Sequence, residues 1–355
     1  MTGRTAATLA GRLAAIAPHL PDALLPRPAY QAARTAAGLL PEAASRFFGL
    51  ECGLGAGAER LGFLACVSRG EGAALARTPI PPALDDAGAR TWAALRRFAA
   101  EWDRPGSPHH RSVLNLWLEF DLEGAAVCRT PSAFLGARGV LGADQKPAAH
   151  LLAGRLEELT RSRLAPGTRA CLARCLAPLP AGAGIFQAGL MSSRTPSALR
   201  ICVTGLRHQD IVPYARAAGW PGDSARAGRL VAGAGAATDR IDVDLDLTEE
   251  VGPTLGLELS FVPKRRPGRE PRWARLVDEL VRTGLSTRPA GDALLGFAGH
   301  DRIEPSPAAG PGGRIEVLAR GLNHLKLTLR PDGGCSAKAY LSVRHLSWPA
   351  DRVTG

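Results

Sequence analysis

Ten segments of the chain alternate apolar and polar residues with the two-residue period of a β-strand, and they come in five pairs. The pairs are Phe47–Cys52 with Leu61–Ser68, Ser112–Leu122 with Ser132–Gly136, Ile185–Ser192 with Ala198–Leu206, Ile241–Leu247 with Leu255–Val262, and Leu322–Arg330 with Ser336–His345. Glycine and proline mark the short connections inside the pairs, which predicts β-hairpins. Helical stretches precede the pairs: Ala6–Ala44, Pro82–Trp102, Lys146–Leu176, His208–Ala234 and Pro271–Gly299. The order predicts five repeats of two helices followed by two strands.

The two faces of the predicted sheet differ in chemistry. Leucine and phenylalanine occupy the even positions of Leu114–Leu122, and the odd positions are Asn115, Trp117, Glu119 and Asp121. The later strands repeat this contrast between an aliphatic face and a face rich in charge. Helices must cover the aliphatic face, so the charged face either meets bulk water, as in an open sheet, or lines the inside of a closed barrel.

Ten strands favour the closed barrel. An open sheet of this size would leave two unprotected edges, whereas closure removes them. Barrels of about eight strands are filled by their own side chains, so ten strands leave room for a solvent-filled lumen. We therefore predict one mixed α/β (α+β) domain over residues 1–355, with five ααββ repeats, a ten-stranded antiparallel barrel, a polar lumen and outer helices.

The rare residues of this chain carry the most information about a site. Lysine and arginine together number 44, but only four of them are lysine, and there are three tyrosines. Three of these rare residues share the charged face of the last predicted hairpin: Lys326, Lys338 and Tyr340. Cross-strand neighbours lie about 5 Å apart, so these side chains can converge on one anion. Three arginines on charged strand faces could add bidentate contacts: Arg200, Arg330 and Arg344. The alternative is that both lysines are solvated cations on an exposed sheet face.

Charge and cysteine usage bear on the class of partner and on the compartment. The net charge is +11, but the densest basic run, Lys264 to Arg275, lacks an aromatic-interleaved strand or a recognition helix. We expect a solvated loop there and no nucleic-acid partner. No apolar run approaches the roughly 18 residues that a membrane span requires. The seven cysteines form no disulfide framework, which indicates reduced thiols and a cytoplasmic location.

Helix pairs and strand pairs around a wide antiparallel barrel resemble the aromatic prenyltransferases of the PT-barrel, or ABBA, type. One local motif supports the resemblance: Lys338-Ala-Tyr340 and its hairpin partner Lys326-Leu-Thr328-Leu-Arg330 are similar to the Lys-x-Tyr strands that surround the prenyl diphosphate in that family. The resemblance implies transfer of an allylic prenyl group from a prenyl diphosphate to an aromatic or peptide acceptor in natural product biosynthesis. It implies that Lys326, Lys338 and Tyr340 bind the diphosphate.

The resemblance also assigns a role to a carboxylate on an early barrel strand. In the family such a group holds the aromatic nucleophile, and Glu119 matches it best, with Asp121 and Glu258 as rivals. Trp117 is among the few strand aromatics that could contact a substrate. The alternative for these carboxylates is charge balance, for example salt bridges to Arg111 or Arg200. For Asp242, Asp244 and Asp246 we expect an exposed or arginine-paired strand end.

Metal dependence and catalysis stay open at this level. The chain has no Asp-Asp-x-x-Asp box, since Asp85-Asp86 is followed by no third carboxylate, so we expect that no cofactor is required and that Mg2+ is optional. Aromatic residues make up 5% of the chain, and only one tyrosine lies on a predicted strand, which favours a flexible or peptide acceptor. The alternative function is a non-catalytic barrel that holds a substrate or precursor peptide for partner biosynthetic enzymes.

Overall fold

The structure is a computed structural model, and it describes residues 8–55, 61–141, 145–194, 197–262, 269–303 and 314–349. The basic run from Lys264 to Arg275 therefore lies partly outside the described residues. The α-helices are α1 (Leu9–Ala15), α2 (Arg27–Gly38), α3 (Gly72–Ala76), α4 (Asp86–Asp103), α5 (Pro108–Ser112), α6 (Gln145–Thr160), α7 (Pro166–Leu176), α8 (Ile211–Ala218), α9 (Ser224–Ala237), α10 (Arg272–Arg282) and α11 (Arg288–Gly296). None of the helices in these ranges is long and apolar enough to cross a membrane.

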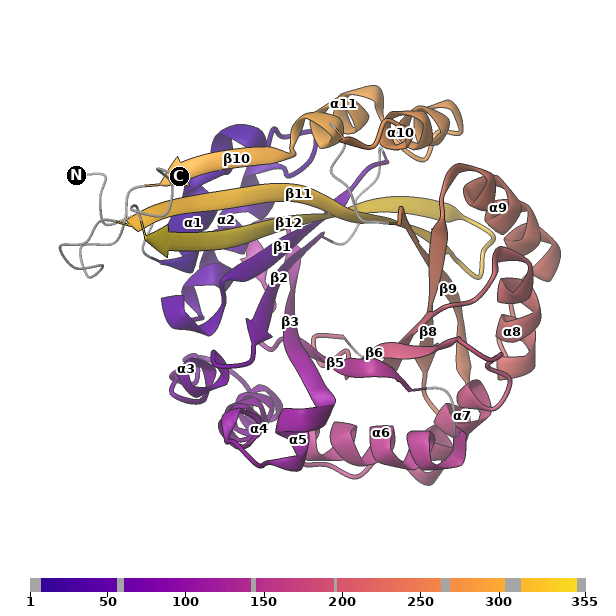
Figure 1. Cartoon of the computed structure of the whole chain (residues 1–355), viewed down its shortest axis with the longest axis horizontal. Helices are drawn as coiled ribbons and strands as arrows, with labels where there is room; N and C mark the ends of the chain where they lie inside the picture. The colour runs from indigo at the N-terminus through magenta and orange to yellow at the C-terminus, as the bar shows by residue number, and fades with distance from the viewer. Residues whose placement is uncertain are drawn as a thin grey trace.

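The strands are β1 (Phe47–Gly53), β2 (Leu61–Ser68), β3 (Val113–Glu123), β4 (Ala126–Val127), β5 (Ser132–Leu141), β6 (Gly184–Leu190), β7 (Leu199–Thr204), β8 (Arg240–Leu247), β9 (Val251–Ser260), β10 (Gly299–Ile303), β11 (Arg314–Leu329) and β12 (Cys335–Pro349). Ten of them close into an antiparallel barrel in the order β11-β12-β1-β2-β3-β5-β6-β7-β8-β9, because β9 pairs with β11. Figure 1 shows the helices arranged outside this ring. The predicted ten-stranded antiparallel barrel with outer helices is confirmed, and the open-sheet alternative is wrong.

Strand β11 has two different neighbours along its length. Its first part pairs with β10, outside the barrel, and its second part pairs with β9 and closes the barrel. The pairing with β12 shifts register between Leu322 and His324, so Asn323 is the extra residue of a β-bulge. A bulge bends its strand and changes the direction of the next side chains. Here it separates the β10-paired extension from the lumen-lining part of β11.

The apolar faces of the barrel strands share one hydrophobic core with the helices. On β3, Leu116, Leu118 and Phe120 are fully buried, as the alternation predicts. On α10, apolar residues at helical spacing bury one face of the helix, and Trp273 meets Phe261 edge-on with ring centroids 4.6 Å apart. The core therefore forms a layer between barrel and helices, and the other strand face is free to build a site.

Four elements were not expected from the sequence. They are α3, α5, β4 and β10, all of five residues or fewer, which is too short for a periodic signal. They add to the expected elements without interrupting the barrel order. Consequently the positions of the lumen-facing residues follow the alternation of the ten long strands.

Candidate functional site

Two cavities occupy the lumen, with volumes of about 400 Å³ and about 500 Å³. Four residues line both cavities and form the boundary between them: Arg200, Asp244, Lys326 and Tyr340. The first cavity lies toward the helix-connected ends of the strands, and we call it the aromatic chamber. The second lies toward the hairpin turns, and we call it the charged chamber.

The charged chamber is lined by more cations than carboxylates. Its cations are Arg194, Arg200, Lys326, Arg330 and Lys338. Its carboxylates are Glu51, Asp244 and Asp246. Its remaining lining is polar or small: Thr254, Gly256, Thr328, Ser336 and Tyr340. Each of the five cations also has a carboxylate partner, Arg194 in Glu119 and Asp121 behind the lining and Arg330 in Asp332. What the chamber offers an anionic guest is therefore a concentration of N–H donors in a confined space.

The two lysines of the charged chamber lie directly opposite each other on β11 and β12. Like charges in that position repel, and each ammonium turns to a different carboxylate. Lys338 Nζ lies 2.5 Å from Glu51 Oε1, and Lys326 Nζ contacts Asp244 Oδ2. The lysines therefore approach the chamber from two sides instead of crowding at one point.

The Lys326–Asp244 ion pair crosses strand β9 at a glycine. Gly256 pairs with Asp244 in the β8–β9 ladder, and a Cβ atom at position 256 would lie 2.9 Å from both Asp244 Cβ and Lys326 Cε. The missing side chain leaves the gap through which the lysine reaches across. This local glycine, not the strand alternation alone, sets the position of the ammonium.

Ionisation of these groups follows from burial and charge. Burial raises the pKa of Glu51, but the adjacent Lys338 charge and hydrogen bond outweigh it and lower the pKa to about 2. Burial lowers the pKa of Lys326, and Asp244 more than restores it, so the net shift is upward. Burial, reinforced by nearby carboxylates, raises the pKa of Tyr340 well above its usual range. At neutral pH Glu51, Asp244 and Lys326 are therefore charged, and the tyrosine is a hydrogen-bond donor.

Arg200 already binds the carboxylate of Asp246, and it is the arginine best placed to bind a ligand anion as well. Its Nε and one terminal nitrogen donate to the two oxygens of Asp246 at 2.7 and 3.0 Å. Its other terminal nitrogen, Nη1, donates to no acceptor within the described ranges, and the side chain lines both chambers. Arg200 can therefore keep its bidentate bond and still offer N–H donors at the boundary.

Glu119 lies beside a half-buried guanidinium that comes from a turn. Arg194, in the connection after β6, donates to Glu119 Oε1 at 3.0 Å and to Asp121 at 3.2 Å. Ser193 of the same turn donates to Asp121 at 2.6 Å. Burial, followed by the charge of Glu51, raises the pKa of Glu119 to about 7 against the opposing effect of Arg194. Glu119 can therefore exchange a proton near neutral pH.

The aromatic chamber has one wall of ring side chains. Phe47, Trp117 and Phe134 lie in one cross-strand row, and the rings of Phe47 and Trp117 meet edge-on at 5.0 Å. On the other wall the rings of His324 and Tyr340 stack at 4.3 Å. A cavity of about 150 Å³ holds one benzene ring, so about 400 Å³ accommodates a fused bicyclic ring with a substituent.

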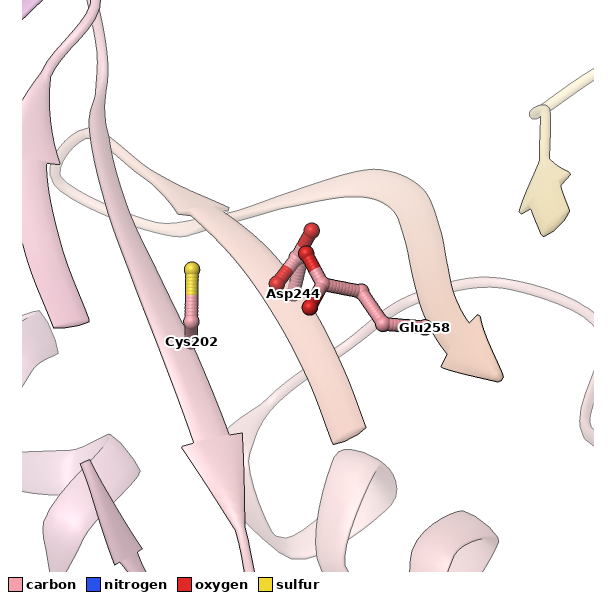
Figure 2. Close-up of side chains that lie close together, drawn as sticks. All are labelled: Cys202, Asp244 and Glu258. Atoms are coloured by element: carbon pink, nitrogen blue, oxygen red, sulfur yellow. The ribbon is translucent and has the colours of Figure 1, made fainter. Parts of the chain in front are cut away.

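Cys202, Asp244 and Glu258 bring three potential metal-ligand atoms within 4.8 Å of one another on β7, β8 and β9 (Figure 2). A thiol is a poor ligand for Mg2+, which prefers oxygen donors. The ammonium of Lys326 already contacts Asp244 and supplies a positive charge at this point. These residues do not fit Mg2+, and we derive no step through a metal.

The structure brings most of the sequence-predicted site residues to the lumen. Those that line a chamber are Trp117, Glu119, Arg200, Glu258, Lys326, Arg330, Lys338, Tyr340 and Arg344. Asp121 is buried behind them and pairs with Arg194. The alternative for these carboxylates named Arg111 or Arg200 as salt-bridge partners, and the partner that Glu119 has is Arg194. The alternative of solvated lysines is wrong, because Lys326 is only 6% exposed and Lys338 is half-buried.

Glu51 and Arg194 are not among the site residues predicted from the sequence. The prediction for the three aspartates of β8 is correct only in part. Glu51 alternates with Leu50 and Cys52 on β1, so the strand pattern itself contained the signal for its inward orientation. Arg194 lies in a turn and carries no periodic signal. Asp242 and Asp246 are arginine-paired, as expected, but Asp244 is 3% exposed and pairs with Lys326.

Comparisons with known proteins support the architecture. No model of a protein family matches the sequence, and no curated protein matches it. Among solved structures, the chain is similar to 5-dimethylallyltryptophan synthase from Streptomyces coelicolor, with 17% sequence identity and a TM-score of 0.55. The similarity covers 95% of this chain and 97% of that one. The expected resemblance to a PT-barrel prenyltransferase is confirmed at the level of the fold.

Proposed function

We propose that this protein transfers an allylic prenyl group from a prenyl diphosphate to an aromatic or peptide acceptor. One observation carries the proposal: a chamber lined by five cations and a chamber with an aromatic wall share a boundary of four residues inside one barrel. Such a reaction needs an anion-binding site and a ring-binding site in contact. The fold shared with a dimethylallyltryptophan synthase supports the same class of chemistry.

In this proposal the diphosphate lies in the charged chamber. Lys326 and Lys338 approach it from β11 and β12, and Arg200 contributes its Nη1 donors at the boundary. The allylic C–O bond breaks and the electron pair leaves with the diphosphate, whose growing negative charge the three cations stabilise. The hydroxyl of Tyr340 donates a further hydrogen bond. These protein cations supply the charge that a metal would otherwise bring, so we propose transfer without Mg2+.

The acceptor lies in the aromatic chamber with its nucleophilic atom toward the boundary. The new bond forms between that atom and the allylic carbon, and the acceptor then loses one proton. Glu119 lines this chamber, and its pKa of about 7 suits a group that accepts the proton and releases it to water. The carboxylate of Glu119 also stabilises the positive charge that develops on the allylic group during transfer.

The proposal is tested by incubating the protein with radiolabelled dimethylallyl or geranyl diphosphate and a panel of aromatic compounds and short peptides. We expect a labelled acceptor with the wild type, both with and without EDTA. Lys338→Ala should lower the yield at least ten-fold, whereas Arg282→Ala on the exposed face of α10 should not change it. Diphosphate binding without any transfer would favour the non-catalytic barrel, and no diphosphate binding at all would refute both the donor site and the transfer.

A further inference from the structure

Arg344 differs from the other cations that line the aromatic chamber. Arg200, Arg240 and Lys326 each form an ion pair with a carboxylate. Arg344 forms no ion pair with any carboxylate in the described part of the chain. It is exposed, and because it also lines the chamber it lies at the chamber's mouth. The mouth thus offers a cation whose charge is not already balanced.

The guanidinium of Arg344 is held in place by an aromatic ring. Its Cζ atom lies 4.2 Å from the ring centroid of Phe47, which neighbours it in the β1–β12 ladder. Stacking uses the face of the guanidinium and leaves its N–H donors at the edge, where they can bind a carboxylate through two hydrogen bonds. Phe47 in turn contacts Trp117, so the cation stands at one end of the row of rings.

We infer that the aromatic chamber takes an aromatic carboxylate, with its rings along the Phe47–Trp117–Phe134 row and its carboxylate on Arg344. The inference rests on the proposed assignment of the acceptor to this chamber and narrows the acceptor class to anionic aromatic molecules. The carboxylate at the mouth would leave the opposite end of the ring system toward Tyr340 and the boundary. Arg344 is in this view a specificity-determining residue that does not touch the reacting atoms.

The test is a calorimetric titration, without prenyl donor, of 2-naphthoate and of its neutral isostere 2-naphthamide. In the wild type we expect the acid to bind at least ten-fold more tightly than the amide, with a preference that shrinks as salt increases. Arg344→Gln should abolish the preference, Arg344→Lys should retain part of it, and Arg282→Gln should leave it unchanged. Thermal unfolding of each variant confirms that the barrel is intact.

Equal binding of acid and amide in the wild type would overturn the inference. An acid preference that survives in Arg344→Gln would do the same, and so would a failure of both ligands to bind.

A competition experiment with inorganic pyrophosphate tests the assignment of Arg344 further. We expect pyrophosphate to bind together with 2-naphthoate, because the two anions use different chambers. Displacement of 2-naphthoate by pyrophosphate would instead assign Arg344 to a phosphate group. No prenyl donor is present in these titrations, so their outcomes do not depend on prenyl transfer. If the protein failed to transfer a prenyl group, the preference for the acid over the amide would be unaffected.

Discussion

Lys326 of β11 and Asp244 of β8 form an ion pair across the intervening strand β9, and Gly256 leaves the space in which they meet. The pair is buried, with both residues 6% exposed or less. It fixes a cation at the boundary of two chambers, where the proposed reaction separates charge. The position of that cation is thus controlled by a residue that has no side chain.

Gly256→Ala is expected to displace Lys326 from Asp244. The added Cβ would lie 2.9 Å from Lys326 Cε, so the lysine must move, and we expect the free energy of unfolding to fall by about 1–3 kcal/mol. The Michaelis constant for the prenyl diphosphate should rise more than kcat falls. The control is Gly154→Ala on α6, where an added Cβ would have no neighbouring atom within 4 Å beyond the backbone of its own helix. This variant should be neutral or stabilising in urea denaturation. Unchanged stability and kinetics for Gly256→Ala would contradict this role.

Lys338→Met is expected to destabilise the protein by about 3–5 kcal/mol at pH 7, because it leaves Glu51 buried and ionised without its partner. The double variant Glu51→Gln with Lys338→Met removes both charges and should recover most of that loss. Urea denaturation of the two variants measures the difference. A double variant as unstable as the single one would show that the ion pair is not the origin of the loss.

Activity is expected to rise with pH through about 7 if Glu119 accepts the proton of the acceptor. The pKa of Glu119 lies at about 7, and only its deprotonated form can act as a base. Glu119→Gln should lower kcat by about 100-fold or more and remove this limb of the pH profile, with little effect on binding of the donor. A pH profile that is the same in the variant and the wild type would exclude Glu119 as the base.

The same group predicts a pH dependence of stability. The folded-state pKa of Glu119 is raised, so its contribution is fully present below the unfolded-state pKa of about 4.3 and is lost as pH rises toward 7. Relative to the wild type, Glu119→Gln should therefore gain about 3 kcal/mol of stability between pH 4 and pH 8. Chemical denaturation at the two pH values measures the gain. A constant difference between variant and wild type would show that Glu119 does not titrate in this range.

Much of the fold could be predicted because each long strand separates its two faces by alternation. Leu116 and Phe120 point to the helices and Glu119 to the lumen, and a two-residue period is sufficient to assign all three. The five hairpins then fix the order of strands around the ring. The short elements could not be predicted, since five residues or fewer carry too little periodicity.

The ion pairs and hydrogen bonds of the site could not be predicted, because the residues that form them lie far apart in the sequence. Arg194 reaches Glu119 from a turn 75 residues away, and no local pattern indicates that contact. The bulge at Asn323 and the gap at Gly256 depend on how neighbouring strands pair. Sequence alternation identifies which residues face the lumen, whereas tertiary packing decides which of them touch.

The charged chamber is proposed to bind the diphosphate of a prenyl donor. Calorimetric titration with dimethylallyl S-thiolodiphosphate, an analogue whose C–S bond resists cleavage, tests it without any need for the acceptor. We expect saturable binding to the wild type and at least ten-fold weaker binding to Lys338→Ala, with Arg282→Ala unchanged. Equal affinity of the wild type and Lys338→Ala, or no binding to either, would contradict the proposal.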